Sequence, residues 1–324
     1  MKHICLLILS FLLLTACAQA TPTARTTHPS LFFLGRRVAY PGIREANEVG
    51  TPTARPMPSG AYLGETPPDY VPKIFSSRLM GAHLHSSPVF TPDGAEVYWG
   101  SIEDAHMRIN MMKLVNGTWT APEKLVLSPA LGDISDPSLS PDGDSLFFIA
   151  RKPALDAPVQ EREFIWVAER GEDGWVSPSP LPQFINAFNT HWTMSTSLAG
   201  DLYFASGPER INDIYISRKV NGEYTPPQKL DAPVNTPEFH EFTPHIAPDG
   251  SFLLFTRSDL ANNSHYLYIT YALPDGQWSE PVRVKNVYYC IAPALSPDGK
   301  YIFFLSDPDH ISWRDTAFIE ELRP

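Results

Sequence analysis

The sequence of 324 residues predicts an all-β protein, a five-bladed β-propeller closed by a strand from the N-terminal side. Three observations support this: a Pro-Asp-Gly phrase recurs along the chain, an aromatic strand follows each copy, and a Gly-aromatic phrase lies downstream of four copies. The composition agrees, because 33 Pro residues and 12% aromatic residues favour many short strands and turns over long helices. A six-bladed ring is the alternative.

The first residues have the pattern of a secretion signal. Residues 1–3 are a short basic start, and residues 4–14 form an apolar run, well short of the roughly 20 residues that span a bilayer. The run ends in Leu-Thr-Ala-Cys at residues 14–17, which resembles the lipobox of bacterial lipoproteins. This resemblance implies a signal peptide over residues 1–16 and lipid attachment at Cys17. An ordinary cleavable signal with an Ala-x-Ala-like site at residues 16–18 is the alternative.

Lipidation of Cys17 predicts a protein held in the cell envelope by its lipid anchor alone. Several acyl chains anchor a protein stably, since each buried methylene contributes about 0.8 kcal/mol. Ala18 follows the cysteine where inner-membrane lipoproteins of enterobacteria carry Asp, so the same resemblance implies the periplasmic face of the outer membrane.

The net charge argues against a nucleic-acid partner, and the cysteines argue against an internal disulfide. A formal net charge of −11 has the wrong sign for binding the phosphate backbone, so nucleic acid is excluded as a partner. The three cysteines are Cys5 in the signal, Cys17 and Cys290, so the mature chain forms no internal disulfide. We expect a monomer whose core alone stabilises the fold.

Residues 17–70 are predicted to be a Pro-rich tether. They lack sustained alternation of polar and apolar residues, and the pentapeptide Thr-Pro-Thr-Ala-Arg occurs twice, at residues 21–25 and 51–55. The propeller is predicted over residues 71–324.

The repeat is the strongest signal in the chain. Its phrase ends in Pro-Asp-Gly in four copies, and a fifth copy at residues 194–200 keeps only the glycine; the glycines are Gly94, Gly143, Gly200, Gly250 and Gly299. Their spacings of 49, 57, 50 and 49 residues define a repeat period. Pro-Asp-Gly between two apolar runs predicts a hairpin, because Pro fixes φ, Asp bonds to the backbone and Gly accepts a positive φ.

Each repeat has room for four strands, which is one propeller blade. A third strand is predicted at residues 213–217 and 266–270, and the Gly-aromatic phrase, the second phrase of the repeat, follows it. The aromatic residues of this second phrase are predicted to pack between blades: Trp119, Trp175, Tyr224 and Trp278. The hairpin with its aromatic strand resembles the WD-like repeats of TolB-like β-propellers over about residues 73–324. That resemblance implies the fold and leaves the function open.

The last blade lacks its outer strand at the end of the chain. Residues 72–75 precede Gly94 by 22 residues, much as residues 122–125 precede Gly143 by 21. We therefore expect this N-terminal strand to complete the fifth blade.

The innermost strands of a propeller converge on a central channel, so site residues are expected where these strands begin. Nine residues before the hairpin glycines stand His85, Ile134, His191, Glu241 and Cys290, and Asp136 lies two residues further along its strand. The predicted binding residues at the channel mouth are His85, Asp136, His191 and Glu241. Three of them, His85, His191 and Glu241, suit a divalent metal ion. The other interpretation is that these groups hydrate the channel or bond neighbouring blades.

Two function classes follow. The first is a non-catalytic module that binds or scaffolds an envelope protein or peptide. The second is a carbohydrate-active enzyme with Glu241 and Asp136 as its paired carboxylates, or a metal site in the channel. The sequence has neither a Gly-x-Ser-x-Gly elbow nor a Gly-rich phosphate loop, which argues against serine hydrolases and nucleotide chemistry.

Overall fold

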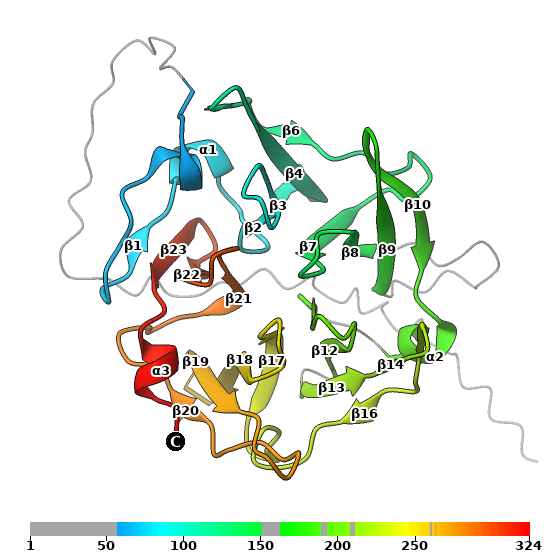
Figure 1. Cartoon of the computed structure of the whole chain (residues 1–324), viewed down its shortest axis with the longest axis vertical. Helices are drawn as coiled ribbons and strands as arrows, with labels where there is room; N and C mark the ends of the chain where they lie inside the picture. The colour runs from blue at the N-terminus through cyan, green and yellow to red at the C-terminus, as the bar shows by residue number, and fades with distance from the viewer. Residues whose placement is uncertain (1–56, 151–162, 189–192, 208–210, 260, 263) are drawn as a thin grey trace, which may run out of the picture. The chain divides into compact units, whose positions relative to one another are not determined.

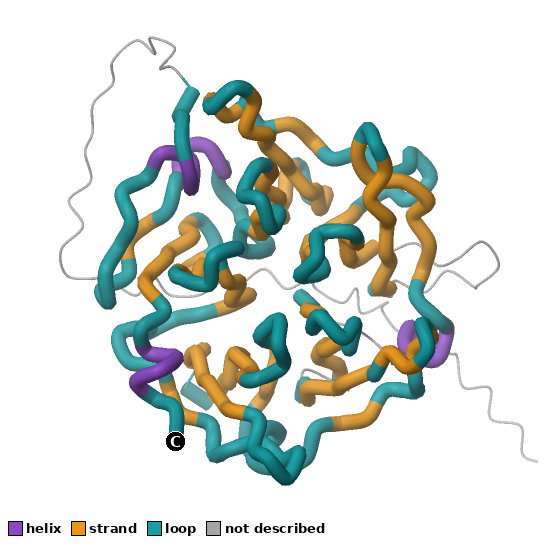
Figure 2. The backbone as a smooth tube through the Cα atoms, in the orientation of Figure 1, coloured by secondary structure: helices purple, strands orange, loops and turns teal. Residues whose placement is uncertain are grey.

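The computed structural model describes residues 57–150, 163–188, 193–207, 211–259, 261–262 and 264–324. Within this part of the chain, five antiparallel sheets stand around a common centre as the blades of a propeller (Figure 1). The prediction of an all-β, five-bladed propeller is therefore confirmed, and the six-bladed alternative is wrong. Short turns and loops at the ends of the strands join the sheets (Figure 2).

The blades follow one another in chain order. Blade 1 contains β2 (Val89–Phe90), β3 (Glu96–Glu103), β4 (His106–Val115), β5 (Thr118–Trp119) and β6 (Glu123–Lys124). Blade 2 contains β7 (Ile134–Leu139), β8 (Ser145–Ala150), β9 (Phe164–Gly171) and β10 (Gly174–Pro180). Blade 3 contains β11 (Ser195–Thr196), β12 (Leu202–Ser206), β13 (Asp213–Ser217) and β16 (Gln228–Lys229), with the small hairpin β14 (Lys219–Val220) and β15 (Glu223–Tyr224) beside it.

Blade 4 contains β17 (His240–Ile246), β18 (Phe252–Asp259), β19 (Ser264–Tyr271) and β20 (Val282–Arg283). Blade 5 contains β21 (Ile291–Leu295), β22 (Tyr301–Asp307) and β23 (His310–Asp315), and its outer strand is β1 (Lys73–Ile74). In the register, Lys73 pairs with Trp313 and Ile74 with Ser312. The first strand of the described chain thus lies on the last blade.

The repeated hairpin turns have a common hydrogen-bond pattern. In blade 2, Ser140 Oγ donates to Asp142 Oδ1 at 2.5 Å and the amide of Asp144 donates to the same oxygen at 3.1 Å. The five turn glycines have φ between +69° and +83°, a conformation that side chains with a Cβ rarely adopt. In blade 3 the Asp is replaced by Ala199, and Ser197 Oγ has no hydrogen-bond partner among the described residues. The degraded copy of the phrase therefore keeps the turn and loses its side-chain bonds.

Three inner strands carry a β-bulge at the same point. Asp136, Thr243 and Ala292 have φ near +50°, each stands before a proline, and the strand register shifts there. A bulge bends the strand and redirects the side chains beside it. The bulges lie where the inner strands begin, which is where the site residues were predicted.

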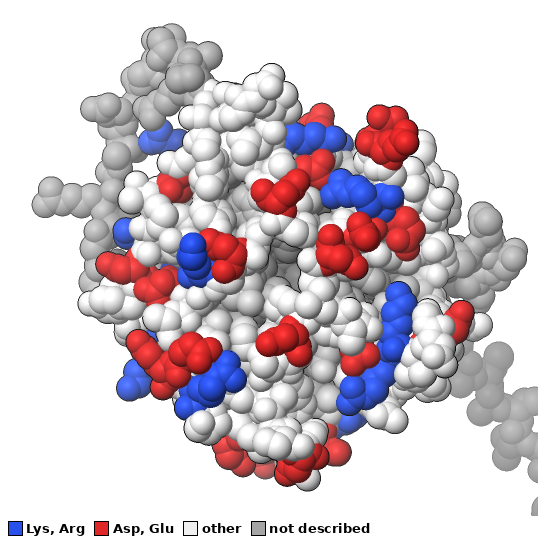
Figure 3. All heavy atoms as spheres, viewed as in Figure 1, with Lys and Arg blue, Asp and Glu red and all other residues white. Residues whose placement is uncertain are grey.

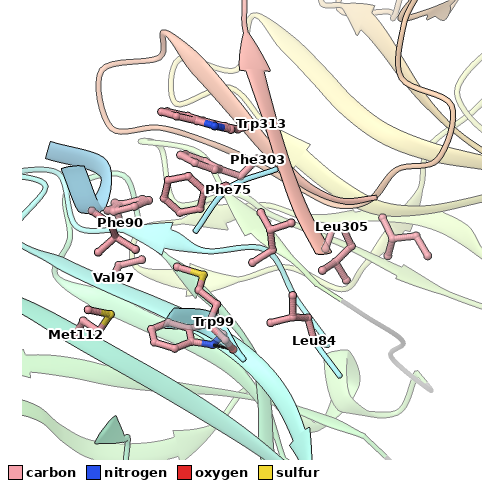
Figure 4. Packing of buried hydrophobic residues seen from close by; sticks show 14 of the residues in the cluster. Phe75, Leu84, Phe90, Val97, Trp99, Met112, Phe303, Leu305 and Trp313 are labelled. Carbon is pink, nitrogen blue, oxygen red and sulfur yellow. Dashed lines mark hydrogen bonds between the residues drawn. The ribbon is translucent and has the colours of Figure 1, made fainter. Parts of the chain in front are cut away.

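A cluster of aromatic residues joins blade 5 to blade 1. Phe75, Phe303 and Trp313 lie on one side of it, and Phe90, Val97 and Trp99 of blade 1 lie on the other (Figure 4). Residues 57–64, which the sequence assigned to the tether, lie against this cluster: Leu63 is 3% exposed, and Trp119 Nε1 donates to the carbonyl of Gly60 at 2.8 Å. The chain before β1 therefore takes part in closing the ring.

The aromatic residues of the second phrase pack against the preceding blade. The ring centroids of Trp175 in blade 2 and Tyr98 in blade 1 are 6.1 Å apart, and Trp278 packs on the core that contains Tyr203 of blade 3. For blade 5, the helix α3 (Phe318–Glu321) takes this place, with Phe318 buried against the blade 4 core. The other helices are η1 (Ala61–Gly64), α1 (Ser77–Met80) and α2 (Gln183–Asn186). None of the helices found in the described ranges has the length and apolar character needed to cross a membrane.

Candidate functional site

His85 and Asp136 meet across the joint between blades 1 and 2. His85 lies before β2, Asp136 lies on the bulge of β7, and His85 Nδ1 is 3.1 Å from Asp136 Oδ2. The Asp136 side chain is 2% exposed and also accepts a hydrogen bond from Ser135 Oγ at 2.7 Å. Two of the predicted channel residues are thus brought together, as a buried carboxylate bonded to an imidazole.

Glu241 lies in blade 4 and is fully engaged by its neighbours. Arg257 Nε donates to Glu241 Oε1 at 2.8 Å, and the hydroxyl and amide of Thr236 donate to the carboxylate at 2.9 and 3.3 Å. The Arg257 guanidinium also donates to the carbonyls of Pro233 and Val234. Burial raises the pKa of Glu241, and the facing Arg257 opposes that shift. The sequence could not show this arrangement, because the partner comes from the neighbouring strand.

The remaining ring positions differ in character. Ile134 and Cys290 are buried, and burial raises the pKa of the Cys290 thiol. His191 lies outside the described residues. Across the ranges that the structure describes, no group of three His, Cys, Asp or Glu side chains is placed to hold a metal ion. The divalent-metal site with His85, His191 and Glu241 stays a prediction, as does catalysis by Glu241 and Asp136.

A groove that the sequence did not single out lies between the hairpins of blades 1 and 2. It has a volume of about 580 Å³ and is bordered by the turns of both blades and by the β9–β10 hairpin. Six carboxylates and two cations line it: Asp93, Glu96, Asp142, Asp144, Glu172, Asp173, Lys113 and Arg170. We call it the acidic groove. Acidic side chains gather near the centre of this face of the propeller (Figure 3).

The two cations of the acidic groove are already paired. Arg170 Nη1 is 2.8 Å from Glu96 Oε2, and Lys113 Nζ is 3.7 Å from Glu96 Oε1. Arg170 also stacks on Trp175, with its guanidinium 3.9 Å from the ring centroid. Hydrogen bonds from Thr91 and Ser140 lower the pKa of Asp93 and Asp142, so both are ionised at neutral pH. The remaining carboxylates make the groove strongly negative.

The only signal for the groove in the sequence is the repeat itself. The turn Asp residues accept hydrogen bonds from nearby hydroxyls and amides, which agrees with the turn-forming role that the Pro-Asp-Gly pattern predicts. The hairpin tip at residues 172–173 lies outside the repeated phrases, so no motif marks it. The groove forms because two consecutive blades place their turns side by side.

No known family model and no curated protein matches the chain. Among solved structures, TolB from Acinetobacter baumannii is similar with a TM-score of 0.46 and 15% identity, over 73% of this chain and 55% of that chain. The putative TolB from Agrobacterium tumefaciens has a TM-score of 0.48 and 16% identity, over 72% of this chain and 74% of that chain. The match therefore spans about half the length of the Acinetobacter protein. A nidogen–laminin complex is similar with a TM-score of 0.44 and 17% identity, over 69% and 72%. These similarities concern the propeller fold alone.

Proposed function

We propose that this protein is a non-catalytic module that binds or scaffolds a protein or peptide in the cell envelope, where lipid on Cys17 holds it. The acidic groove is the observation that carries the binding proposal. It is open to solvent between two blades, and its cations are both paired with one of its own carboxylates. A partner with a basic segment would complement the charge that remains.

The hydrogen bonds of Glu241 and Asp136 support a non-catalytic role. A glycosidase needs one carboxylate that protonates the leaving group and a second one that attacks or activates water. The carboxylate of Glu241 accepts bonds from Arg257 and Thr236, and Asp136 is bonded to His85 and Ser135. These contacts stabilise strands and the joint between blades.

Peptide binding tests the groove directly. A fluorescent Lys/Arg-rich peptide and an acidic peptide of equal length are titrated with the protein expressed without residues 1–16, and binding is followed by anisotropy at low and physiological salt. We expect only the basic peptide to bind, with an affinity that falls as the salt concentration rises. The charge reversal Glu172→Lys with Asp173→Lys should weaken binding roughly tenfold or more, at about 1.4 kcal/mol per tenfold change.

The control reverses two exposed acids outside the groove. Glu223→Lys with Glu280→Lys changes the net charge equally and is expected to leave the affinity within about twofold. Equal loss in both variants would mean that net charge, and not the groove, attracts the peptide. No binding by any peptide would reject the groove as the docking surface.

Anchoring is tested separately. Cys17→Ser should abolish metabolic labelling with a palmitate analogue and release the protein from the membrane fraction. Cys5→Ser is the matched control and should leave both unchanged. Labelled protein in the Cys17→Ser variant would contradict the anchor.

A further inference from the structure

Histidine side chains accept one of the hydrogen bonds at each joint between blade 4 and its neighbours. Other bonds cross the joint with blade 3, among them the amide of Glu241 to the carbonyl of Asn212 at 3.0 Å and Ser195 Oγ to the carbonyl of Pro244 at 2.9 Å. The amide of Asn212, which precedes β13 of blade 3, donates to His240 Nδ1 at 3.3 Å. The amide of Leu295, on β21 of blade 5, donates to His245 Nε2 at 3.3 Å. Both histidines lie on β17, the inner strand of blade 4. One strand is thus bonded to the blade on either side by an imidazole nitrogen.

These two bonds require neutral imidazoles. A ring nitrogen that accepts a hydrogen bond carries no proton, and a protonated imidazole has only donors. Protonation of His240 or His245 therefore sets N–H against N–H at the joint. The requirement follows from the direction of the main-chain donors.

We propose that blade 4 is an acid-releasable blade: protonation of His240 and His245 loosens its inner strand from blades 3 and 5 and opens the ring at that position. The joint between blades 1 and 2 is built differently, because there a histidine faces a carboxylate: His85 Nδ1 is 3.1 Å from Asp136 Oδ2. Blades 5 and 1 are joined by the aromatic cluster, which does not titrate.

The charged surroundings of the two histidines agree with this direction. His240 is 7% exposed and faces Asp213 on β13, which is itself paired with Lys229 at 2.7 Å, and His265 on β19 lies near it. Burial lowers the pKa of His240, and Asp213 opposes that shift. His245 faces the main chain of blade 5, and burial lowers its pKa to about 4. Burial and the neighbouring His240 likewise lower the pKa of His265 to about 4.

The sign of the pH effect follows from these directions. A histidine with a pKa of about 4 in the closed ring regains its ordinary value near 6.5 when the joint opens. The open state then binds more protons between these values, so acid favours opening throughout this window. For His245 alone, the equilibrium constant for opening should be roughly 30-fold larger at pH 5 than at pH 7.5.

Hydrogen exchange at the two donor amides tests the proposal. Exchange of the folded protein is measured by mass spectrometry at pH 7.5 and pH 5, with correction for the intrinsic rates. We expect peptides that contain the amides of Asn212 and Leu295 to lose protection at pH 5, roughly 30-fold at Leu295. Peptides that contain the amide of Gly100, which donates to Ser86 Oγ in blade 1, should keep theirs. Equal protection at both pH values would overturn the proposal.

A double variant with two conservative substitutions separates opening caused by these histidines from general instability in acid. Asn places an amide oxygen near the Nδ1 position and Gln places one near Nε2, and neither accepts a proton in this range. His240→Asn with His245→Gln should fold at pH 7.5 and lose much less protection than the wild-type protein at the amides of Asn212 and Leu295 at pH 5; His265, whose pKa is also lowered to about 4, is unchanged in this variant and accounts for the loss that remains. Undiminished acid opening in this variant would assign the effect to other groups. If the variant does not fold, the wild-type comparison between Leu295 and Gly100 still decides the question.

Discussion

Phe75 and Trp313 lie with their ring centroids 5.0 Å apart and their planes at 62°, an edge-to-face contact between the start of the propeller and its last strand. Phe303 is 4.8 Å from Phe75 and stacks on Trp313 at 9° (Figure 4). The amide of Phe75 also donates to the carbonyl of Ile311 at 2.8 Å. Because β1 has only two residues, these rings stabilise the closed ring more than its ladder of backbone hydrogen bonds does.

Replacing Phe75 by Ala should therefore lower the free energy of unfolding by about 3–5 kcal/mol, since the side chain is completely buried. Urea unfolding followed by tryptophan fluorescence measures the change. Ile74→Ala is the control, because Ile74 is 40% exposed and should cost less than about 1 kcal/mol. Similar costs for the two variants would show that the ring closes without this cluster.

Ala199→Asp should stabilise blade 3. In the other four copies the turn Asp accepts a hydrogen bond from the amide two residues on, and in three of them also from a Ser or Thr hydroxyl. Asp at 199 would give Ser197 Oγ a partner and raise the free energy of unfolding by about 0.5–1.5 kcal/mol. Asp142→Ala, which removes the same bonds from blade 2, should have the opposite sign. A melting temperature that falls in the Ala199→Asp variant would contradict this account.

The fold could be predicted because its signals are local. Gly143, Asp142 and Ser140 form their turn from four consecutive residues, and the spacing of five such turns fixes the number of blades. The contribution of residues 57–64 could not be predicted, because it rests on long-range contacts. The hydroxyl of Tyr62 donates to Asp298, 236 residues away in the chain, and nothing near Tyr62 indicates this.

The candidate site was only partly predictable for the same reason. Counting back from the glycines placed His85 and Glu241 where the inner strands begin, and His85 meets Asp136 as a neighbour around the ring. The spacing from the glycines does not show that Arg257 faces Glu241, since that depends on the register between β17 and β18. The sequence does not mark His245 as a joint residue, because it lies inside the repeat phrase at residues 244–250, which indicates only a hairpin. The acidic groove belongs to two blades and to no single motif.

Arg257→Leu should destabilise the protein by about 3–5 kcal/mol, because it leaves the carboxylate of Glu241 buried without its cation. Burial raises the pKa of Glu241, and loss of Arg257 raises it further. A carboxyl whose pKa is higher in the folded protein than its ordinary value near 4.3 stabilises the fold at low pH and loses that contribution as pH rises. Urea unfolding should therefore show a larger deficit at pH 7.5 than at pH 5.

The double variant Arg257→Leu with Glu241→Leu is the control for this pair. Removing both charges should recover much of the loss and abolish the difference between the two pH values. A deficit that does not depend on pH would assign the cost to the stacking of Arg257 on Tyr268, where its guanidinium is 4.9 Å from the ring centroid.

Cys290 should be unreactive while the ring is closed. Its side chain is completely buried between blades 4 and 5, and burial raises the pKa of the thiol, so little thiolate is present and no reagent reaches it. In a background with Cys5→Ser and Cys17→Ser, the thiol of Cys290 should react with iodoacetamide at neutral pH at least roughly 100-fold more slowly than the thiol of a Val126→Cys variant that also carries Cys290→Ala. The side chain of Val126 is 72% exposed. Urea should make the two rates equal. Equal rates in the folded proteins would mean that the joint between blades 4 and 5 is open at neutral pH.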